Sequence, residues 1–183
     1  MNNLAYNYQF DDEPDYEIIE GEINYMAAAA PNISHGIIVS RLNTIFNVYI
    51  DEKNLKAFVL ADNADVYLSE ENHFRPDVSV IVRKPYAINR EKYIDGAPDL
   101  IVEVLSESTM KNDTGIKKDA YEKHGVKEYW IVDPNSRSIQ VYHNIEGKFK
   151  RNGEYNVDNN KIKVSIFEDL VVDVRAVFKW WLD

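Results

Sequence analysis

One carboxylate lies in the middle of an apolar segment, residues 99–106, and this feature constrains the fold more than any other. The centre of the segment is β-branched and aliphatic and follows Ala97-Pro98, which is typical of a buried strand. Side chains alternate between the faces of a strand, so Glu103 shares a face with Ile101 and Leu105. Because an uncompensated buried charge is strongly destabilising, we expect a metal ion, a lysine or a water-filled cleft beside Glu103.

The overall composition is that of an ordinary globular protein. Of the 183 residues, 45% are hydrophobic and 28% are charged, which excludes a disordered or fibrous class. The length suits one domain better than two, so we expect a single domain over residues 16–183 after a mobile acidic leader, residues 1–15. No apolar run approaches the roughly 20 residues that span a bilayer, and the first residues lack the pattern of a secretory signal. We therefore expect a cytoplasmic protein without membrane contact.

The residue types limit the chemistry that the chain can perform. It has no cysteine, which excludes disulfides, thiolate zinc sites and cysteine nucleophiles. Its four histidines are scattered, so carboxylate oxygens are the plentiful metal ligands. The formal net charge of −10 argues against a protein that coats nucleic acid indiscriminately, although it is compatible with a local basic groove.

Hydrophobic periodicity predicts both helices and strands. Apolar residues recur on one helical face over residues 33–50, and a second helix is expected over residues 112–124, with Asn112 or Asp113 as its cap. A closing helix is expected over residues 173–181. The remaining expectations are two short strands around a turn at Glu20-Gly21, strands at residues 56–62, 65–69, 76–82, 99–106, 127–133 and 138–143, a polar connection at residues 83–96, and short exposed strands between residues 147 and 164.

Two of these strands and the second helix supply groups that suit metal-assisted hydrolysis. Asp77 begins the strand at residues 76–82, Glu103 lies in the apolar strand, and Lys117 lies on the helix that follows. Two carboxylates, a backbone carbonyl and water suit magnesium or manganese. Such an ion stabilises charge on a phosphoryl group and lowers the pKa of a water that it binds, while a nearby lysine can orient that water. The arrangement is compatible with phosphodiester hydrolysis, although acidic residues at strand ends are common.

The same residues resemble a known nuclease superfamily. Arg75-Pro76-Asp77 followed by a strand, and then the segment 97–106, are similar to the motifs of the PD-(D/E)XK nucleases. The core of that superfamily is a mixed sheet flanked by helices. The resemblance therefore implies an α/β, restriction-endonuclease-like fold with a central mixed β-sheet and α-helices on its faces.

A second group of motifs is more specific. It closely resembles the Uma-two family of bacterial restriction-endonuclease-like proteins, and the similarity spans roughly residues 16–133. The motifs that carry it are, in chain order, residues 17–22, His35, residues 106–109, Asp113, Lys117, Tyr121 and residues 125–134. The resemblance implies a magnesium-dependent (or manganese-dependent) endonuclease that hydrolyses DNA phosphodiester bonds, and it implies a homodimer.

The resemblance also implies roles for particular residues. Asp77 and Glu103 are the implied metal-binding acids, and the backbone carbonyl of Val104 is implied to complete the metal site. The superfamily usually places its lysine two residues after the second acid, where this chain has Leu105. The family is implied to supply that lysine from the following helix, at Lys117.

Simpler structural readings of these residues stay open at this point. Glu103 can instead form a buried salt bridge to Lys117 with no metal, and Asp77 can simply cap a turn. The lysine of the site can be Lys118, although it points about 100° away from Lys117 around a helix. Asp113 and Lys117 are also spaced as an exposed helical ion pair.

The roles of several neighbours, and the class of activity, also have alternatives. We expect Tyr121 to pack and Glu17, Glu20 and Glu22 to be solvated hairpin residues that could instead supply a ligand; His35 either begins its helix or faces the site. A rival class is a nuclease-fold binding or scaffold protein without turnover, which the acidic composition favours. A nuclease for RNA or single strands is a further alternative.

Overall fold

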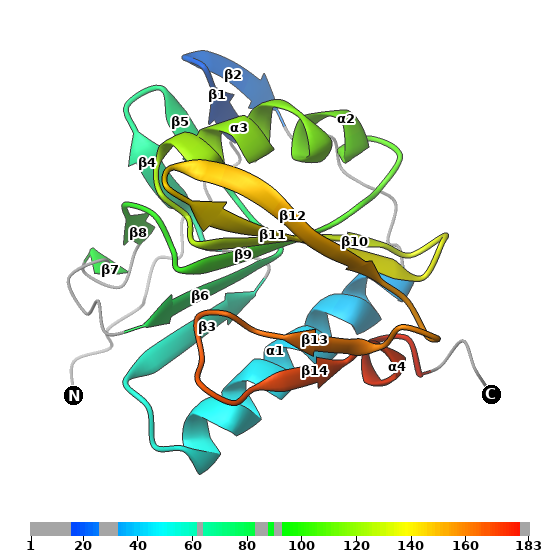
Figure 1. The fold of residues 1–183 in the computed structure, drawn as a ribbon. Coiled ribbons are helices and arrows are strands. Elements are labelled where there is room, and N and C mark those ends of the chain that lie inside the picture. The colour runs from blue at the N-terminus through cyan, green and yellow to red at the C-terminus, as the bar shows by residue number, and fades with distance from the viewer. Residues whose placement is uncertain (1–15, 26–32, 62–63, 83–87, 90–92, 180–183) are drawn as a thin grey trace, which may run out of the picture.

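The computed structural model describes residues 16–25, 33–61, 64–82, 88–89 and 93–179 (Figure 1). The helices are α1 (Ile33–Glu52), α2 (Met110–Thr114), α3 (Ile116–Lys123) and α4 (Val174–Val177). The strands are β1 (Tyr16–Ile19), β2 (Glu22–Tyr25), β3 (Ala57–Ala61), β4 (Val66–Ser69), β5 (Asn72–Phe74), β6 (Val78–Val82), β7 (Ile88–Asn89), β8 (Tyr93–Asp95), β9 (Leu100–Val104), β10 (Glu128–Asp133), β11 (Ser138–Ile145), β12 (Lys148–Tyr155), β13 (Lys161–Lys163) and β14 (Val171–Asp173). The predicted leader, residues 1–15, lies outside the described residues. None of the described helices has the length and hydrophobicity of a membrane-spanning segment.

The strand with the central carboxylate, β9, lies inside a six-stranded mixed sheet. The strand order is β12-β11-β10-β9-β6-β3. β9 and β10 are parallel, while the other neighbours are antiparallel. The strands predicted at residues 127–133 and 138–143 are both present and form the antiparallel β10-β11 hairpin. The mixed sheet that the sequence predicts is therefore present.

The two faces of this sheet pack against different layers. Val102 and Val104 of β9 point to one face, where they join the buried side of α1 and α4 in the main core. Ile101 and Leu105 point to the other face, where they pack with α3 and with a second sheet. Figure 1 shows α1 on one side of the central sheet and α2 with α3 on the other. Glu103 contacts α3, so the predicted alternation of β9 is confirmed.

The second sheet covers the central sheet on the same side as α3. Its strand order is β2-β1-β5-β4-β8-β7. In β1, Glu17 and Ile19 are buried while Tyr16 and Ile18 are half-buried, so Glu17 faces the interior together with Ile19. β5 ends at Phe74, in the same cluster, and the chain then continues directly into β6. Two segments, β1 and the β5-β6 connection, therefore lie on the α3 side of β9.

The helix predicted over residues 112–124 is in fact two helices. α2 and α3 are separated by Gly115, whose backbone angles (φ −117°, ψ −104°) are far from helical. A side chain there would place its Cβ 3.0 Å from the carbonyl oxygen of Lys111, so the break favours glycine. Asp113, predicted as a possible cap, lies inside α2 with its side chain buried. The apolar periodicity missed the break because it gives no information on backbone angles at a single glycine.

Other predicted elements differ where strand pairing decides the structure. The polar connection predicted at residues 83–96 contains β7 and β8. The exposed strands predicted after residue 147 include β12, an eight-residue partner of β11. The closing helix is α4, which is shorter than predicted, and residues 180–183 lie outside the described residues. The strands β7, β8 and β12 have weak hydrophobic patterns in the sequence, because cross-strand neighbours rather than intrinsic propensity stabilise them.

Helix α1 is confirmed, with one difference in its buried face. Leu42, Phe46 and Ile50 are buried as the spacing predicts. Ile33, the first apolar residue of the range predicted to share that face, is 79% exposed. At about 100° per residue, Ile33 lies on the opposite side of the helix from Leu42. The first turn of α1 therefore presents an apolar side chain to solvent.

Side-chain truncation should have different effects on the buried face of α1 and on its exposed first turn. Phe46→Ala should lower the free energy of unfolding by about 3–5 kcal/mol, because its ring is fully buried with its centroid 5.9 Å from that of Trp130. Ile33→Ala is the control from the same helix and should change it by no more than about 0.5 kcal/mol. Chemical denaturation followed by circular dichroism measures both. A similar loss in the two variants would contradict the described orientation of α1.

Candidate active site

A buried ammonium lies at the centre of the candidate site. The Nζ atom of Lys117, on α3, lies 2.8 Å from Oε1 of Glu103 and 3.1 Å from Oε1 of Glu17. Oδ1 of Asp113, four residues earlier on α2, is 3.2 Å away. The lysine side chain is only 5% exposed. Three carboxylates, from β9, β1 and α2, therefore lie within ion-pairing distance of this ammonium.

Glu103 is held by further contacts. Its Oε1 atom also accepts a hydrogen bond from the hydroxyl of Tyr121 at 2.8 Å, and its Oε2 atom accepts one from the backbone N–H of Asp77 at 3.3 Å. The register of β6 against β9 places Val78 opposite Val102. In an antiparallel pair this register brings the residue before Val78 beside the residue after Val102. The two acids predicted to act together therefore meet through strand pairing.

Asp77 lies on the solvent side of the cluster. Its Oδ2 atom accepts a hydrogen bond from the N–H of Val104 at 2.6 Å, and its Oδ1 atom is 3.1 Å from Nε2 of His35 in the first turn of α1. The side chains of Asp77 and His35 are 18% and 25% exposed, against 3% for Glu103. A small ligand that enters from solvent would therefore meet Asp77 and His35 before Glu103.

Hydrogen bonds to the backbone fix the elements that carry the supporting carboxylates. Oε1 of Glu17 accepts the N–H of Arg75 at 2.9 Å, which ties β1 to the segment that leads into β6. The hydroxyl of Tyr129, on β10, donates to the backbone carbonyl of Asp113 at 2.8 Å. The ring of Tyr129 is fully buried, so this hydrogen bond anchors α2 to the central sheet.

The cluster contains more acid than base. Four carboxylates, those of Glu17, Asp77, Glu103 and Asp113, lie around one lysine. Burial raises the pKa of Glu103 well above its usual 4.5; Lys117 opposes this increase, and the neighbouring carboxylates add to it. Burial likewise raises the pKa of Asp113. The surplus of negative charge favours the uptake of a proton or of another cation.

The lysine at the centre keeps its proton. Burial by itself lowers the pKa of Lys117, but Glu103, Asp113 and Glu17 together raise it well above the usual 10.5. Burial, followed by the charge of Glu103, also raises the pKa of Tyr121. At neutral pH both groups are therefore hydrogen-bond donors, and Lys117 is a fixed positive charge rather than a base.

Comparison with known proteins gives this cluster a family context. The sequence pattern of the family Uma2, described as "Putative restriction endonuclease", matches residues 3–175. The chain belongs to the Uma2 family. Its structure is also similar to the crystal structure of "a putative nuclease belonging to DUF820" from Anabaena variabilis, with a TM-score of 0.74 and 21% sequence identity over 91% of each chain. At that identity the likeness concerns the fold, and the predicted restriction-endonuclease-like α/β fold is confirmed. No curated protein matches the chain.

In this Uma2 protein the predicted site residues lie together. Asp77, Glu103 and Lys117 are connected through the contacts described above, although the sequence places them on three different elements. Lys118 points elsewhere, with its Nζ atom 4.3 Å from the centre of the Tyr142 ring. The geometry therefore favours Lys117 over Lys118 as the lysine of the cluster.

The interpretation of the N-terminal hairpin needs a correction at one position. Glu20 and Glu22 are exposed, as predicted, but Glu17 is 8% exposed and contacts Lys117. A signal for this was present, because Glu17 shares a strand face with the apolar Ile19. The strand is too short for that alternation to decide between a buried face and a solvated one.

The interpretation of the second helix needs a similar correction. Asp113 and Lys117 do form the predicted ion pair, but both side chains are buried rather than exposed. Tyr121 is packed as predicted, with its ring fully buried, and its hydroxyl also donates to Glu103. The face of α3 that carries Lys117 and Tyr121 is thus turned toward the site.

The donors suit a hard divalent ion in type but do not form a complete cage. Magnesium and manganese prefer oxygen ligands, and the surplus negative charge around Glu103 favours a cation. The part of the chain that the structure describes has no group of three or more histidine or acidic side chains arranged to hold a metal. Asp77 and Glu103 would therefore bind such an ion as a pair, with backbone carbonyl and water oxygens as the other ligands.

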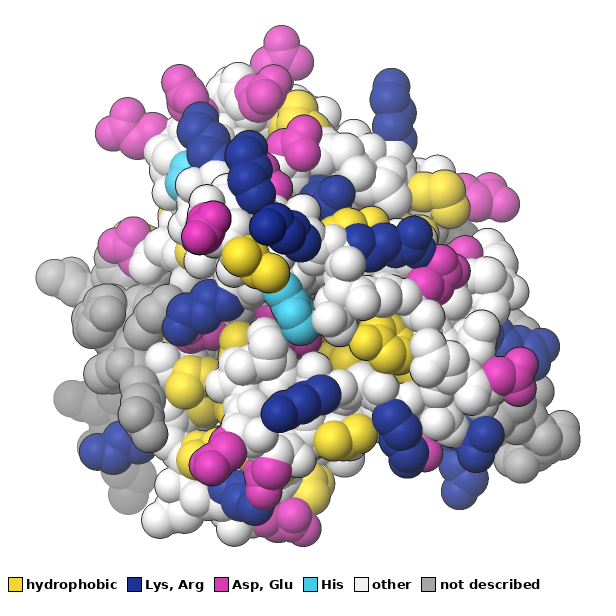
Figure 2. All heavy atoms as spheres, in the orientation of Figure 1, with side chains coloured by type: hydrophobic (Ala, Val, Ile, Leu, Met, Phe, Trp, Pro, Cys, Tyr) yellow, Lys and Arg dark blue, Asp and Glu magenta, His cyan; other side chains and the backbone are white. Residues whose placement is uncertain are grey.

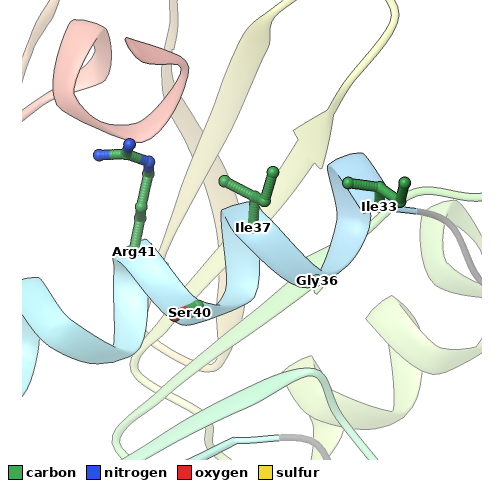
Figure 3. A pocket seen from close by; sticks show the side chains of 5 residues that line it. All are labelled: Ile33, Gly36, Ile37, Ser40 and Arg41. Carbon is green, nitrogen blue, oxygen red and sulfur yellow. The ribbon is translucent and has the colours of Figure 1, made fainter. Parts of the chain in front are cut away.

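A separate hollow of about 470 Å³ lies on the outer side of α1 (Figure 3). It is lined by Ile33, Gly36, Ile37, Ser40 and Arg41. Arg41 donates a hydrogen bond to the carbonyl of Ala176 at 3.2 Å, so the hollow lies beside α4. His35, which contacts Asp77, lies on the other side of the helix at 100° per residue. The hollow is therefore not part of the acidic cluster.

The raised pKa of Glu103 predicts a pH dependence of stability for the metal-free protein. Above about pH 4.5 the unfolded chain loses this proton before the folded chain does, so the contribution of Glu103 to the free energy of unfolding decreases as pH rises. The stability of Glu103→Gln relative to wild type should therefore increase with pH. Denaturant unfolding between pH 4 and pH 8 in the presence of a chelator measures the difference.

Glu122→Gln provides a control of opposite sign. Hydrogen bonds from Lys148 and from the N–H of Phe149 lower the pKa of Glu122. Its contribution is present above the unfolded pKa and is lost as pH falls, so this variant should lose stability relative to wild type as pH rises from acid. Parallel trends in Glu103→Gln and Glu122→Gln would contradict the assignment of surplus charge to the cluster.

Proposed function

We propose that this Uma2 protein is a magnesium-dependent or manganese-dependent endonuclease that hydrolyses DNA phosphodiester bonds. The observation that carries the proposal is the surplus of carboxylates around Lys117, next to an acid, Asp77, that reaches solvent. Such a cluster favours a divalent cation, and the family context supports a phosphodiester substrate.

Each residue of the cluster has a proposed role. Asp77 and Glu103 would hold the ion, with the backbone carbonyl of Val104 as a further ligand. When bound, the ion supplies Lewis-acid stabilisation of negative charge on the phosphoryl group. Lys117 remains protonated, so it orients the attacking water and offsets charge that develops in the transition state. Tyr121 keeps Glu103 in place by donating to its Oε1 atom.

The distribution of charge supports a nucleic-acid substrate better than the net charge does. Residues 111–151 contain nine lysine or arginine residues and six acidic residues, which gives this segment a net charge of +3. The rest of the chain contains twelve lysine or arginine residues and twenty-five acidic residues, which gives it a net charge of −13. In Figure 2, lysine and arginine side chains gather over α3 and β12, and acidic side chains gather at the tips of β1-β2 and β4-β5. Lys148 and Arg151 are 77% and 48% exposed. Exposed basic side chains of this kind contact phosphates.

A second candidate function is supported by the ion pairs themselves. The three carboxylates around Lys117 form ion pairs with it without any metal. A catalytically inactive binding or scaffold protein with a nuclease fold would keep this arrangement for stability alone. Ion binding therefore separates the two candidates.

Three further properties belong to the proposal. We infer a homodimer, because cleavage of both strands of a duplex is simplest with two-fold symmetry. We also infer a single domain over residues 16–183 and a location in the cytoplasm. Light scattering, limited proteolysis and microscopy of a tagged protein test these properties in turn.

Isothermal titration with magnesium or manganese tests the metal site. Wild type should bind at least one ion, and Glu103→Gln should weaken binding by about tenfold or more, because it removes one of two charged ligands. Glu22→Gln, an exposed change of the same kind, should bind as wild type does. Absence of ion binding in the wild type would refute the nuclease mechanism and favour the scaffold alternative.

Cleavage assays on plasmid, linear duplex and RNA test the substrate and the lysine. Lys117→Met should lower the rate on DNA by about 100-fold, because it removes a donor that acts on developing charge. Lys118→Met, one residue away and directed at Tyr142, is the matched control and should retain most of the activity. Equal activity of the two variants would refute the role of Lys117. Cleavage of RNA or single strands alone would reassign the substrate.

A further inference from the structure

Glu17 has no role in the proposed mechanism, yet it connects the parts of the site. Its side chain is 11% exposed and comes from β1, about 60 residues before Asp77 and about 100 before Lys117. A single oxygen, Oε1, accepts the N–H of Arg75 at 2.9 Å and lies 3.1 Å from Nζ of Lys117. Arg75 precedes Asp77 by two residues. Glu17 therefore links the lysine to the chain segment that carries one of the two acids.

A comparison of the three carboxylates around Lys117 distinguishes Glu17 from Glu103. Glu103 already accepts the hydroxyl of Tyr121 and the N–H of Asp77, and it is one of the two proposed metal ligands. In the proposed mechanism its oxygens would therefore be shared between the ion and the ammonium. Glu17 and Asp113 are not proposed as metal ligands. Glu17 contacts Lys117 and the N–H of Arg75, and Asp113 contacts Lys117.

We propose that Glu17 is a positioning residue for Lys117. Together with Asp113 it holds the ammonium in place through ion pairs at 3.1 and 3.2 Å. The contact of the ammonium with Glu103 is then the one that could be exchanged for water or phosphate if Glu103 binds the ion. The catalytic consequence rests on the proposed function, whereas the placing of the ammonium is a property of the free protein.

A purely structural role for Glu17 makes a different prediction. In that case the useful contact is the hydrogen bond from the N–H of Arg75, which ties β1 to the β5-β6 connection. A glutamine has the same shape and keeps a carbonyl oxygen that accepts this bond. Glu17→Gln therefore preserves the structural contact and removes the charge that holds Lys117.

The first test measures the order of the ammonium directly, without ion or substrate. In the metal-free, ¹⁵N-labelled protein, the Lys117 ammonium should give a resonance protected from exchange with water, which is absent in Lys117→Met. Glu17→Gln should broaden or abolish that resonance, and the exposed control Glu22→Gln should retain it. A resonance of wild-type width in Glu17→Gln would overturn the proposal.

A second variant keeps this test decisive. Asp113→Asn loosens the same ammonium from another element, so it should reproduce the loss seen in Glu17→Gln. Thermal unfolding of each variant establishes that it folds. If Glu17→Gln does not fold, an undisturbed ammonium resonance in Asp113→Asn would still overturn the two-anchor arrangement.

The kinetic test separates this inference from the proposed function. At saturating magnesium, Glu17→Gln should lower kcat by about 10- to 100-fold, with KM for duplex DNA within about twofold of wild type. Glu22→Gln should leave both constants unchanged. An unchanged kcat in Glu17→Gln would overturn the catalytic consequence. Failure of the wild type to cleave any substrate would refute the proposed function, while the ammonium resonance would still decide the placing of Lys117.

Discussion

The buried ammonium of Lys117 is the interaction on which this site depends. Its contacts reach three different elements, β1, β9 and α2, of which β1 lies about 100 residues before Lys117. A buried lysine without acidic partners would be costly, and so would the carboxylates without the lysine. Each charge is therefore stabilised by groups on other elements. The packing of the second sheet and of α2-α3 over β9 is thus coupled to the electrostatics of the cluster.

That coupling leaves the cluster with more negative charge than one lysine can balance. The pKa of Glu103 is raised because burial and neighbouring carboxylates act in the same direction. In a protein selected only for stability, an apolar residue at this position would avoid the penalty. Retention of a buried carboxylate beside a solvent-reaching one, Asp77, is more typical of a site that takes up a cation. The buried carboxylate of Glu103 thus lowers the stability of the ion-free protein and at the same time supports the proposed function.

The sequence predicted the parts of the fold that have a strong local pattern. The alternation in β9 correctly separated Val102 and Val104 from Ile101 and Leu105, and the helical spacing of α1 was clear. The meeting of the strand acids depends on the register of β6 against β9, which no local pattern contains. The resemblance to a family pointed to the acids, but their contact comes from a pairing across 26 positions.

Glu17 shows why the remainder of the site was not predictable. Glu17 lies in a four-residue strand next to a glycine turn, and so short a sequence does not distinguish a buried acid from a solvated one. Its burial is decided by α3, which follows about 100 residues later and turns Lys117 toward it. That orientation in turn depends on the break at Gly115 and on the bond from Tyr129 to the carbonyl of Asp113. A lysine carried by a helix rather than by the strand of the acids needs such external anchors, and these anchors are tertiary contacts.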